Sequence, residues 1–518
     1  MNEDTYLVKV EGVDTDGKRW FWLWSNGQGH IEGNDTYDAR VIEAGAFSRQ
    51  LFRSSTTLTD RSSVGYGEIV INNKDGALDP LLDVAFDGRS VRISRVDGLL
   101  VLEGTIAGVE FTRDTITFRV RDYQEFVAEQ LLVPETYAGD NILPDGLEGV
   151  EGDIKGSSKP LTLGKVRSAP LPNVNTSKLI YQTSVRAQKV GAGTSTAIHV
   201  LAINGVEDGG AALTAGADYP DLATLLSTSP AASNYRAFPG SVAEGAYVRL
   251  GSIPARLVTA DMLEGNSAAD RTVPELMRRV CVLGGVPYHK IVGVEEAVAL
   301  CPWESGYFCH EGAQHTAGEV LDALAASIHG YWIGQADGSI KIGVFRAPQG
   351  LPVKYFDEYN VLQDGTAIER RVSNGEGLPF WRVHVEYQKL WAVQSKTELA
   401  GVALARQEYL GREYRKTDPA YSDAIKARHP LSTEITFRTL LDSLADANSL
   451  RDTLFSMYSV KRDMYQIALN AKEAEGVDIG DEVRLSLPRF GLQDGKNFIT
   501  IGRQDILSQS KTVLSVWG

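Results

Sequence analysis

The stretch GEIVINNKDGALDPLLDVAFDGRSVRI, from Gly67 to Ile93, decides the fold that the sequence predicts. It begins as a strand, breaks at an Asp-Gly pair, passes a short apolar segment with a proline, and resumes as a strand after a second Asp-Gly pair. Asp-Gly pairs favour tight turns between strands. A second stretch with a similar order of features, VDIGDEVRLSLPRFGLQDGKNFITIG, covers residues 477–502.

The two stretches belong to a longer repeat near the two ends of the chain. Val483 and Leu485 take the places of Val91 and Ile93 in the strand that follows the acidic-glycine turn. After that strand, NFITIGRQDIL matches LEGTIAGVEFT, and SKTVLSVWG matches RDTITFRVRD. An internal repeat fixes the architecture of a chain. We therefore expect a mainly β protein with α+β insertions, in which two β-barrel domains are related by internal duplication and smaller accessory domains accompany them.

Length and composition describe a large globular protein. The chain has 518 residues, enough for about three or four domains. Its 52 basic and 67 acidic residues give a net charge of −15, whereas a nucleic-acid-binding surface needs a basic footprint. Three cysteines are too few for a disulfide framework. Because the N-terminus is acidic and no stretch of about 20 apolar residues occurs, we expect a soluble protein that folds in a cytoplasm and does not insert into a membrane.

The pattern along the chain predicts four parts. Residues 1–135 form the first barrel domain, and residues 136–270 form an accessory β-rich domain. Residues 271–345 form a small α/β domain, and residues 346–518 form the second barrel domain, with a long helix and a C-terminal β-meander.

Three helices and one hairpin are expected in the second half. The long helix runs from near Arg438 to Met457, and the hairpin turns at Asp337-Gly338. The other two helices begin with capping boxes, in which a threonine and a glutamate three residues later bond each other's backbone: Thr272 with Glu275, and Thr316 with Glu319.

One stretch, CPWESGYFCHEGAQH, gathers the side chains Cys301, Cys309, His310 and His315. Zinc binds such side chains, but structural zinc sites usually have two to four residues between paired cysteines, and here seven intervene. His310 also lacks a second histidine four residues later, which a helical zinc-protease motif needs. We therefore expect no metal and no cofactor, with these four residues as the candidates if one binds.

Other signs of chemistry are weak. The segment NNKDGALD, residues 72–79, lacks the distant glutamate of a calcium loop, so we expect a turn held by Asn and Asp side chains. The chain has no G-x-S-x-G elbow and no P-loop. The adjacent carboxylates Asp357 and Glu358 point apart on any regular element. No enzymatic activity is expected.

A tryptophan stripe occurs in RWFWLW, where alternate residues share one face of a strand. Such a stripe can bind sugars, but tryptophan is enriched where a large area is buried, which favours a core or an interface. Strand position and aromatic character select eight interface candidates: Trp20, Trp22, Trp24, Val91, Ile93, Val483, Leu485 and Trp517.

Several phrases together resemble the baseplate hub proteins of tailed bacteriophages. They are the stretch from Gly67 to Ile93, KPLTLGKVR, YVRLGSIPARLVTADMLEG, LDALAASIHGYWIGQADGSIKIG, and the terminal DIGDEVRLSLPRFGL, FITIGRQDIL and TVLSVWG. The resemblance spans most of the chain in the family's order. It implies two tube-like β-barrel hub domains per chain and a homotrimer. Six similar barrels would then adapt the sixfold tail tube to the threefold tail tip around the DNA ejection channel.

The resemblance also implies a location and partners. The location is the distal end of the tail in the virion, after assembly in the host cytoplasm. The partners are further copies of the chain, the distal tail protein and tail tube, the tape-measure protein, and the central fibre or other tail-tip proteins. Phage DNA would pass without specific binding, in line with the negative charge of the chain. Two alternatives stay open: a tail-tip carbohydrate-binding (receptor) protein, through residues 176–260, and a cell-wall glycan hydrolase.

Overall fold

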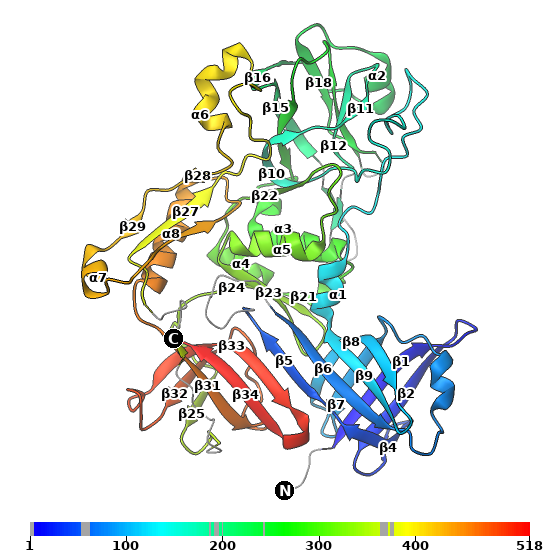
Figure 1. Cartoon of the computed structure of the whole chain (residues 1–518), viewed down its shortest axis with the longest axis vertical. Coiled ribbons are helices and arrows are strands. Elements are labelled where there is room, and N and C mark those ends of the chain that lie inside the picture. Colours follow the sequence, from blue (N-terminus) through cyan, green and yellow to red (C-terminus); the bar gives the residue numbers. More distant parts are fainter. Residues whose placement is uncertain are drawn as a thin grey trace.

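The computed structural model describes residues 5–52, 63–185, 188–190, 196–198, 200–241, 244–362, 371–372 and 378–518. The chain is mainly β, with two barrels and additional sheets and helices, as predicted. Figure 1 shows the two barrels side by side at one end of the molecule, a helical layer next to them, and a second β-rich region at the opposite end. Among the described residues, no helix has the length and apolar character needed to span a membrane.

The first barrel is a closed ring of seven strands in the order β6-β9-β8-β7-β1-β2-β4, with β4 pairing back to β6. Alternate residues along these strands point inward, so Val8, Ile71 and Phe118 are fully buried in one core. The short strand β3 (His30–Glu32) forms a hairpin with β4. The barrel strands are β1 (Tyr6–Val13), β2 (Arg19–Asn26), β4 (Asp35–Glu43), β6 (Ser63–Asn72), β7 (Ser90–Arg95), β8 (Leu100–Phe111) and β9 (Thr115–Asp122).

The segment between β6 and β7 is the turn and apolar plug that the sequence predicts. The amide of Lys74 donates a hydrogen bond of 3.0 Å to Oδ1 of Asn72, the first of several Asn and Asp side-chain bonds in this turn. The 3-10 helix Asp79–Asp83 follows, and its Leu81 is buried in the core of the first barrel. The prediction of a turn held by Asn and Asp side chains is therefore confirmed.

The second barrel surrounds a core of its own, with strands in the order β25-β32-β33-β34-β31-β26. A bridge between Val361 and Leu469 brings the segment after β25 back to β31 and closes the barrel. Ile467, Val483 and Leu514 are fully buried inside it. The strands are β25 (Lys354–Asp357), β26 (Arg371–Val372), β31 (Asp463–Asn470), β32 (Glu482–Ser486), β33 (Lys496–Ile506) and β34 (Lys511–Trp517).

One strand joins the two barrels. β5 (Ala46–Gln50) pairs with β6 of the first barrel and with β33 of the second, and both pairings are antiparallel. The strands of both barrels therefore belong to a single 15-stranded sheet. In Figure 1, β5 lies between the two barrels.

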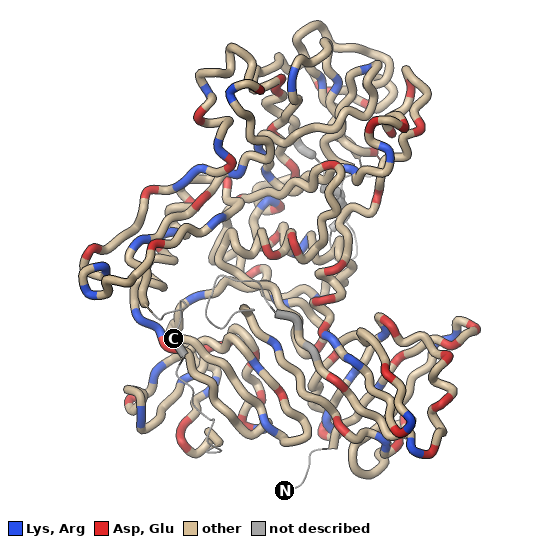
Figure 2. The backbone as a smooth tube through the Cα atoms, in the orientation of Figure 1, with Lys and Arg blue, Asp and Glu red and all other residues tan. Residues whose placement is uncertain are grey.

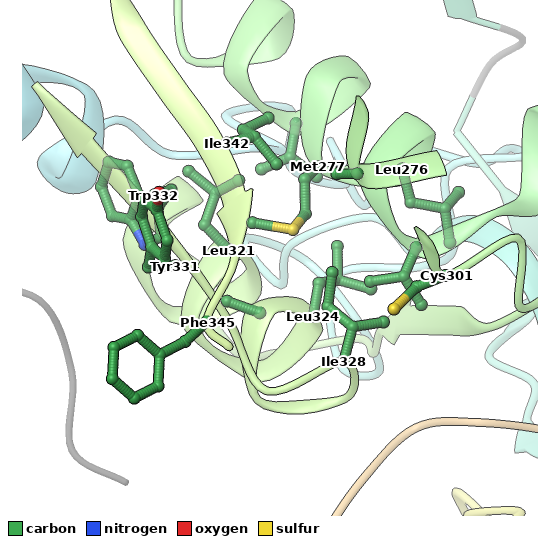
Figure 3. Packing of buried hydrophobic residues seen from close by; sticks show 14 of the residues in the cluster. Leu276, Met277, Cys301, Leu321, Leu324, Ile328, Tyr331, Trp332, Ile342 and Phe345 are labelled. Carbon is green, nitrogen blue, oxygen red and sulfur yellow. The ribbon is translucent and has the colours of Figure 1, made fainter. Parts of the chain in front are cut away.

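A helical layer lies between the barrels and the outer β-rich region. Figure 3 shows Met277, Leu321 and Ile342 packed together in its apolar core. The sequence analysis did not predict the short helix α1, which follows the first barrel. The elements of the layer are α1 (Tyr123–Glu129), α3 (Val273–Leu283), β21 (Ile291–Val292), α4 (Val294–Leu300), α5 (Ala317–Ala326), β23 (Gly330–Gly334) and β24 (Ile340–Val344).

One of the two predicted capping boxes is present. Thr316 and Glu319 bond each other's backbone at the start of α5, as expected. The capping box at Thr272 is wrong, because the Thr272 hydroxyl donates a hydrogen bond of 3.0 Å to the carbonyl of Ala269 instead. The hydroxyl is oriented toward that carbonyl and accepts no hydrogen bond from the first turn of α3.

The long helix α8 (Leu444–Tyr458) is shorter than predicted. Its first residue follows Ser443, whose side chain caps the helix. Arg438, near which the predicted helix began, is the last residue of the strand β30 (Glu434–Arg438). This strand pairs in parallel with β27 (Arg382–Tyr387). The remaining elements of this region are α6 (Gln407–Leu410), β28 (Arg415–Lys416), β29 (Ala420–Tyr421) and α7 (Asp423–Arg428).

The outer region contains two five-stranded sheets, in the orders β16-β15-β20-β10-β22 and β11-β12-β19-β18-β17. A separate short pair, β13 with β14, accompanies them. The elements are β10 (Leu161–Pro170), β11 (Asn173–Asn175), β12 (Ile180–Ser184), β13 (Gln188–Val190), β14 (Thr196–Ile198), β15 (Val200–Asp208), β16 (Ala211–Ala212), β17 (Thr214–Ala215), α2 (Leu222–Ser227), β18 (Asn234–Phe238), β19 (Ala246–Leu250), β20 (Val258–Glu264) and β22 (Gly306–Cys309).

Candidate assembly site

The two barrels repeat each other in strand register as well as in strand order. In β8 the pairing with β9 shifts between Ile106 and Gly108, and in β33 the pairing with β34 shifts between Thr500 and Gly502. Each β-bulge lies just before a glycine in the corresponding strand of its barrel. A bulge is a specific local departure from the ladder, so its repetition extends the predicted duplication to the backbone geometry.

The turn before each repeated strand has the same backbone hydrogen bond. The amide of Gly88 donates to the carbonyl of Ile106 over 2.9 Å, and the amide of Gly480 donates to the carbonyl of Thr500 over 2.8 Å. Both glycines have positive φ, at 70° and 88°, which other residues rarely adopt. The two turns therefore place β7 and β32 in the same way against the next strand.

Equivalent positions in the two barrels carry buried apolar side chains. The register aligns β6 with β31, β7 with β32, β8 with β33 and β9 with β34. The aligned pairs, each member of which lies in the core of its own barrel, are Ile69 with Ile467, Ile71 with Leu469, Val91 with Val483, Ile93 with Leu485, Phe118 with Leu514, and Val120 with Val516.

A further sign of the repeat, which the sequence analysis missed, follows β6 and β31. The amide of Lys74 donates to Oδ1 of Asn72, and the amide of Lys472 donates to Oδ1 of Asn470, both over 3.0 Å. The stretches INNK and LNAK thus form the same side-chain turn. This match would have extended the repeat by one strand.

The barrels meet where β5 lies against the second half of β33. The register runs from Gly502, opposite Gln50, to Ile506, opposite Ala46. The amide of Leu51 adds a hydrogen bond of 2.8 Å to a β33 carbonyl. Because β5 also pairs with β6, one strand completes the ladders of both barrels. We call this contact the barrel joint.

Two arginines of the first barrel pair with carboxylates of the second across the barrel joint. Nη2 of Arg49 lies 3.0 Å from Oδ1 of Asp478, and Nη2 of Arg95 lies 2.5 Å from Oε1 of Glu475. The two arginine side chains are only 6% and 9% exposed. The hydrogen bonds that Arg95 donates to Asp97, and then the one to Glu475, raise the pKa of Arg95 above its ordinary value. Buried charges are costly unless paired, so these pairs favour one arrangement of the barrels.

A cavity of about 290 Å³ lies beside these ion pairs, between the barrels. Tyr6 and Leu99 contribute to its wall from the first barrel. Arg503 of β33 also lines it and pairs with Asp505 over 2.8 Å. The charged groups of this cavity therefore satisfy one another, which makes it part of the barrel joint.

Asp122 ends β9 where the first barrel meets the helical layer. Its carboxylate accepts hydrogen bonds from the amides of Gly65, over 2.8 Å, and Gln124, over 3.1 Å. Burial raises the pKa of this carboxyl group to about 6, against the opposing effects of these bonds and of nearby Arg49. Asp122 is therefore a buried group that titrates near neutral pH. The repeated register aligns Gly518, in the second barrel, with Asp122.

The outward face of the second barrel near the joint is small and polar. One row of residues crosses it from Gln50 of β5, through Gly502 and Ser515, to Gln466 of β31. The amide of Gln466 donates to the hydroxyl of Ser515 over 3.4 Å. This row is uncharged. Gln466 and Ser515 point away from the core, because their neighbours along β31 and β34 are buried in that core.

The equivalent outward face of the first barrel carries charges of both signs. Arg119 lies 3.6 Å from Glu68 and 3.2 Å from Glu110, and all three side chains are exposed. Figure 2 shows basic and acidic residues interspersed along both barrels, without a basic stripe. On this face, the charge of Arg119 is thus balanced by neighbouring carboxylates.

Six of the eight predicted interface residues lie inside the protein. Their exposed fractions are 1% for Trp24 and 0% for the other five: Val91, Ile93, Val483, Leu485 and Trp517. A partner could reach these side chains only if a core opened, so in this fold they are core residues. Strand position selected them, but the two-residue period of a strand does not say which of its faces is the inner one.

The tryptophan stripe runs from solvent into the core of the first barrel. Trp20 is 45% exposed, and Nζ of Lys18 lies 3.9 Å from the centre of its ring. Trp22 packs edge-on against Phe86, with 5.4 Å between the ring centres. Trp24 is the buried end of the stripe. A contact with another protein stays a prediction for Trp20 and Trp22.

The Cys and His candidates lie in different environments, although the ring centres of His310 and His315 are 5.1 Å apart. Cys301 and Cys309 are buried in the apolar core of the helical layer, and burial raises the pKa of Cys301 to about 12. His310 is exposed, whereas His315 places Nδ1 3.3 Å from the Tyr307 hydroxyl. A cysteine binds a metal ion as the thiolate, which burial disfavours here. Within the ranges that the structure describes, no group of three His, Cys, Asp or Glu side chains is placed to hold a metal ion.

No protein-family model and no curated protein matches the chain. Among solved structures, the tail protein from Neisseria meningitidis MC58 aligns with 99% of this chain and 96% of its own, at 11% identity and a TM-score of 0.42. The 43 kDa tail protein of prophage MuSo2 from Shewanella oneidensis aligns with 99% of this chain and 98% of its own, at 10% identity and a TM-score of 0.41.

A third solved structure is the virion of a native gene transfer agent particle. One of its chains aligns with 76% of this chain and 90% of its own, at 12% identity and a TM-score of 0.43. These structural neighbours are thus tail and virion proteins. At such identities and TM-scores they carry no argument about the function of this chain, which is drawn below from its own residues.

Proposed function

We propose that this chain is a structural protein of a bacteriophage tail, and specifically the baseplate hub at the distal end of the tail. Three copies form a closed ring of six barrels that continues the tail tube and surrounds the DNA ejection channel. The sequence resemblance suggests this role, and the repeated barrels give it a physical basis. The proposed role is non-enzymatic.

The barrel joint is the observation that carries the proposal. It connects two similar barrels through different surfaces, the β5 side of the first and the β33 side of the second. A contact between unlike surfaces of like units adds further units in one direction, and it gives a ring when the rotation closes. A chain with two such barrels is therefore suited to be one segment of a ring.

The outward face beside the barrel joint fits a channel wall. Its uncharged row and its paired Arg119 would let a polyanion pass without adhering, because affinity for DNA depends on unpaired basic groups near phosphates. We propose that this face surrounds the channel through which phage DNA and the tape-measure protein pass.

The remaining surfaces are proposed to contact other tail proteins. In this arrangement the barrels meet the distal tail protein and the tail tube. The outer β-rich region, on the far side of the helical layer, meets the central fibre or other tail-tip proteins (Figure 1). The protein is thus proposed to reside in the virion after assembly in the host cytoplasm.

Native mass spectrometry combined with electron microscopy of the purified protein tests the proposal. The expected particle has three times the 56.4 kDa mass of one chain and shows a ring with a central opening, threefold symmetry and a sixfold outline. A stable dimer, or a trimer without a central opening, would contradict it.

A further inference from the structure

β8 has an open edge at the position where its counterpart β33 is covered. Its pairing with β7 reaches Thr105, whereas its pairing with β9 continues over Gly108–Phe111. In the part of the chain that the structure describes, no strand lies on the other side of Gly108–Phe111. The equivalent segment of β33, Gly502–Asp505, is where β5 pairs.

Alternate residues of this segment direct their backbone groups toward the open side. The amide of Thr112 donates to β9 over 2.8 Å. In an antiparallel ladder, alternate residues direct both backbone groups to the same neighbour. Glu110 therefore also faces β9, whereas Val109 and Phe111 direct their N–H and C=O groups away from β9. An unpaired row of this kind is a template for another strand.

The equivalent glycines Gly108 and Gly502 differ in the free space around them. A Cβ atom built on Gly502 would lie 3.3 Å from the side chain of Gln50 in β5. A Cβ atom built on Gly108 would have no neighbour within 4 Å. The first barrel thus has room where the second barrel holds a strand.

The second barrel has its own strand in the place that β5 occupies in the first. β5 pairs antiparallel with β6, with Ser48 opposite Tyr66. β26 pairs antiparallel with β31, with Arg371 opposite Met464. The repeated register equates Tyr66 with Met464, so β26 stands beside β31 as β5 stands beside β6.

We propose that the open edge of β8, Gly108–Phe111, receives β26 from a second copy of this chain. The contact between copies would repeat the contact that β5 makes with β33 within one copy. This inference rests on the proposed function, because a closed ring of repeated barrels requires the joint inside the chain to recur between chains. The interface would consist of β8 of one copy and β26 of the next.

Engineered cysteines test the register of the interface. Within one chain, Ser48 lies opposite Gln504, and the equivalent positions across the proposed interface are Arg371 and Glu110. Opposite residues of an antiparallel ladder are about 4.5–5.5 Å apart at Cα, which a disulfide can span. The variant E110C/R371C is expected to form disulfide-linked multimers on mild oxidation.

Two further pairs serve as controls. The variant S48C/Q504C is expected to form a link inside one chain, because these residues face each other in the barrel joint. The variant I31C/R371C places one cysteine on β3, away from the open edge, and is expected to stay unlinked. The native cysteines are buried and leave a low background.

A proline substitution tests the backbone contact. Proline lacks the N–H that Val109 directs to the open side, and an edge strand tolerates proline at such a position. V109P is expected to keep the thermal unfolding midpoint of the isolated chain within a few degrees and to weaken assembly at least tenfold in a sedimentation series. V109A, which keeps the N–H, is expected to assemble as the native chain does.

The outcomes separate the inference from the proposed function. Multimers of E110C/R371C together with weakened assembly of V109P support the inference. Rings that form normally in V109P, without links in E110C/R371C, overturn the inference and leave the proposed function standing. If the native chain forms no multimer at any concentration in the series, both fail, because no copy then meets another.

Discussion

Arg49 and Asp478, 429 residues apart in the sequence, form an ion pair of 3.0 Å across the joint between the two barrels. Nη1 of Arg49 also donates to the carbonyl of Gly334 over 3.1 Å. One side chain of β5 therefore connects the first barrel to the second barrel and to the helical layer.

Removal of this carboxylate is expected to destabilise the native chain. We predict that Asp478→Asn lowers the free energy of unfolding by about 2–3 kcal/mol, because Arg49 stays buried and loses its charged partner. A urea titration followed by tryptophan fluorescence measures the change.

An exposed ion pair provides the matched control. Asp452 is 62% exposed and lies 2.8 Å from Arg451. Asp452→Asn is expected to change the free energy of unfolding by less than about 0.5 kcal/mol, since exposed pairs contribute little. Equal losses in the two variants would show that the Arg49 pair has no special role.

The buried carboxyl group of Asp122 predicts a pH dependence of stability. Its pKa in the folded chain, about 6, is above the ordinary aspartate value of 3.8, so between these pH values the folded state binds more protons than the unfolded state. The contribution of Asp122 to the free energy of unfolding is therefore expected to fall by at most about 3 kcal/mol as the pH rises from about 4 to about 7.

Comparison with Asp122→Asn isolates this contribution. The variant has no proton to lose, so its stability is expected to decline less between pH 4 and pH 7 than that of the native chain. Asp87→Asn, at an exposed position, is expected to follow the native curve. Parallel curves for the native chain and Asp122→Asn would refute the assignment.

The repeat could be predicted from the sequence because its signals are local. Acidic-glycine turns and alternating apolar residues mark β7 and β32, and the equivalent Val91 and Val483 are both buried. The side-chain turn at Asn470 could also have been predicted, from the match between LNAK and INNK, but the sequence analysis did not include it. The division of the chain at residues 135, 270 and 345 stays a prediction.

The barrel joint could not be predicted, because it depends on contacts that the sequence pattern does not encode. β5 is a five-residue strand, and its partner, Gly502–Ile506, lies near the other end of the sequence. Six of the eight interface candidates lie in a core for a related reason, since alternation along a strand does not identify the inner face. Thr272 shows that a capping-box motif does not always form its bonds, because its hydroxyl is oriented toward the Ala269 carbonyl and does not cap the helix.

The three cysteines are expected to be unreactive in the folded chain. Cys281, Cys301 and Cys309 are buried, and burial raises the pKa of each thiol above its ordinary value. Thiolate is the reactive form. Ellman's reagent should therefore label none of them quickly at pH 8 and all three in denaturant. Rapid labelling of one cysteine in the native chain would contradict this burial.

Equivalent core substitutions are expected to affect the two barrels separately. Phe118 and Leu514 occupy the same register position in the two cores, and both are fully buried. Substitution of either by alanine should cost about 3–4 kcal/mol of unfolding free energy. Hydrogen exchange followed by mass spectrometry should show lost protection mainly in β6–β9 for Phe118→Ala and in β31–β34 for Leu514→Ala. Loss spread evenly over both barrels in each variant would indicate a single fused core.

The proposed channel wall predicts a gain of DNA binding when its charge is changed. Glu68 and Gln466 are equivalent outward positions on the two barrels. The double variant Glu68→Lys/Gln466→Lys brings two lysines per chain to the proposed channel, so an assembled ring should retain DNA with an affinity that falls steeply with salt.

A variant with the same change in net charge tests whether position or total charge is responsible. Asp16→Lys/Gln493→Lys changes two exposed loop residues away from the outward rows of the joined sheet. We expect this control to bind DNA no better than the native chain in filter-binding assays from 50 to 300 mM salt. If both double variants bind alike, the lysines act through net charge alone, and the outward face beside the barrel joint does not surround the channel.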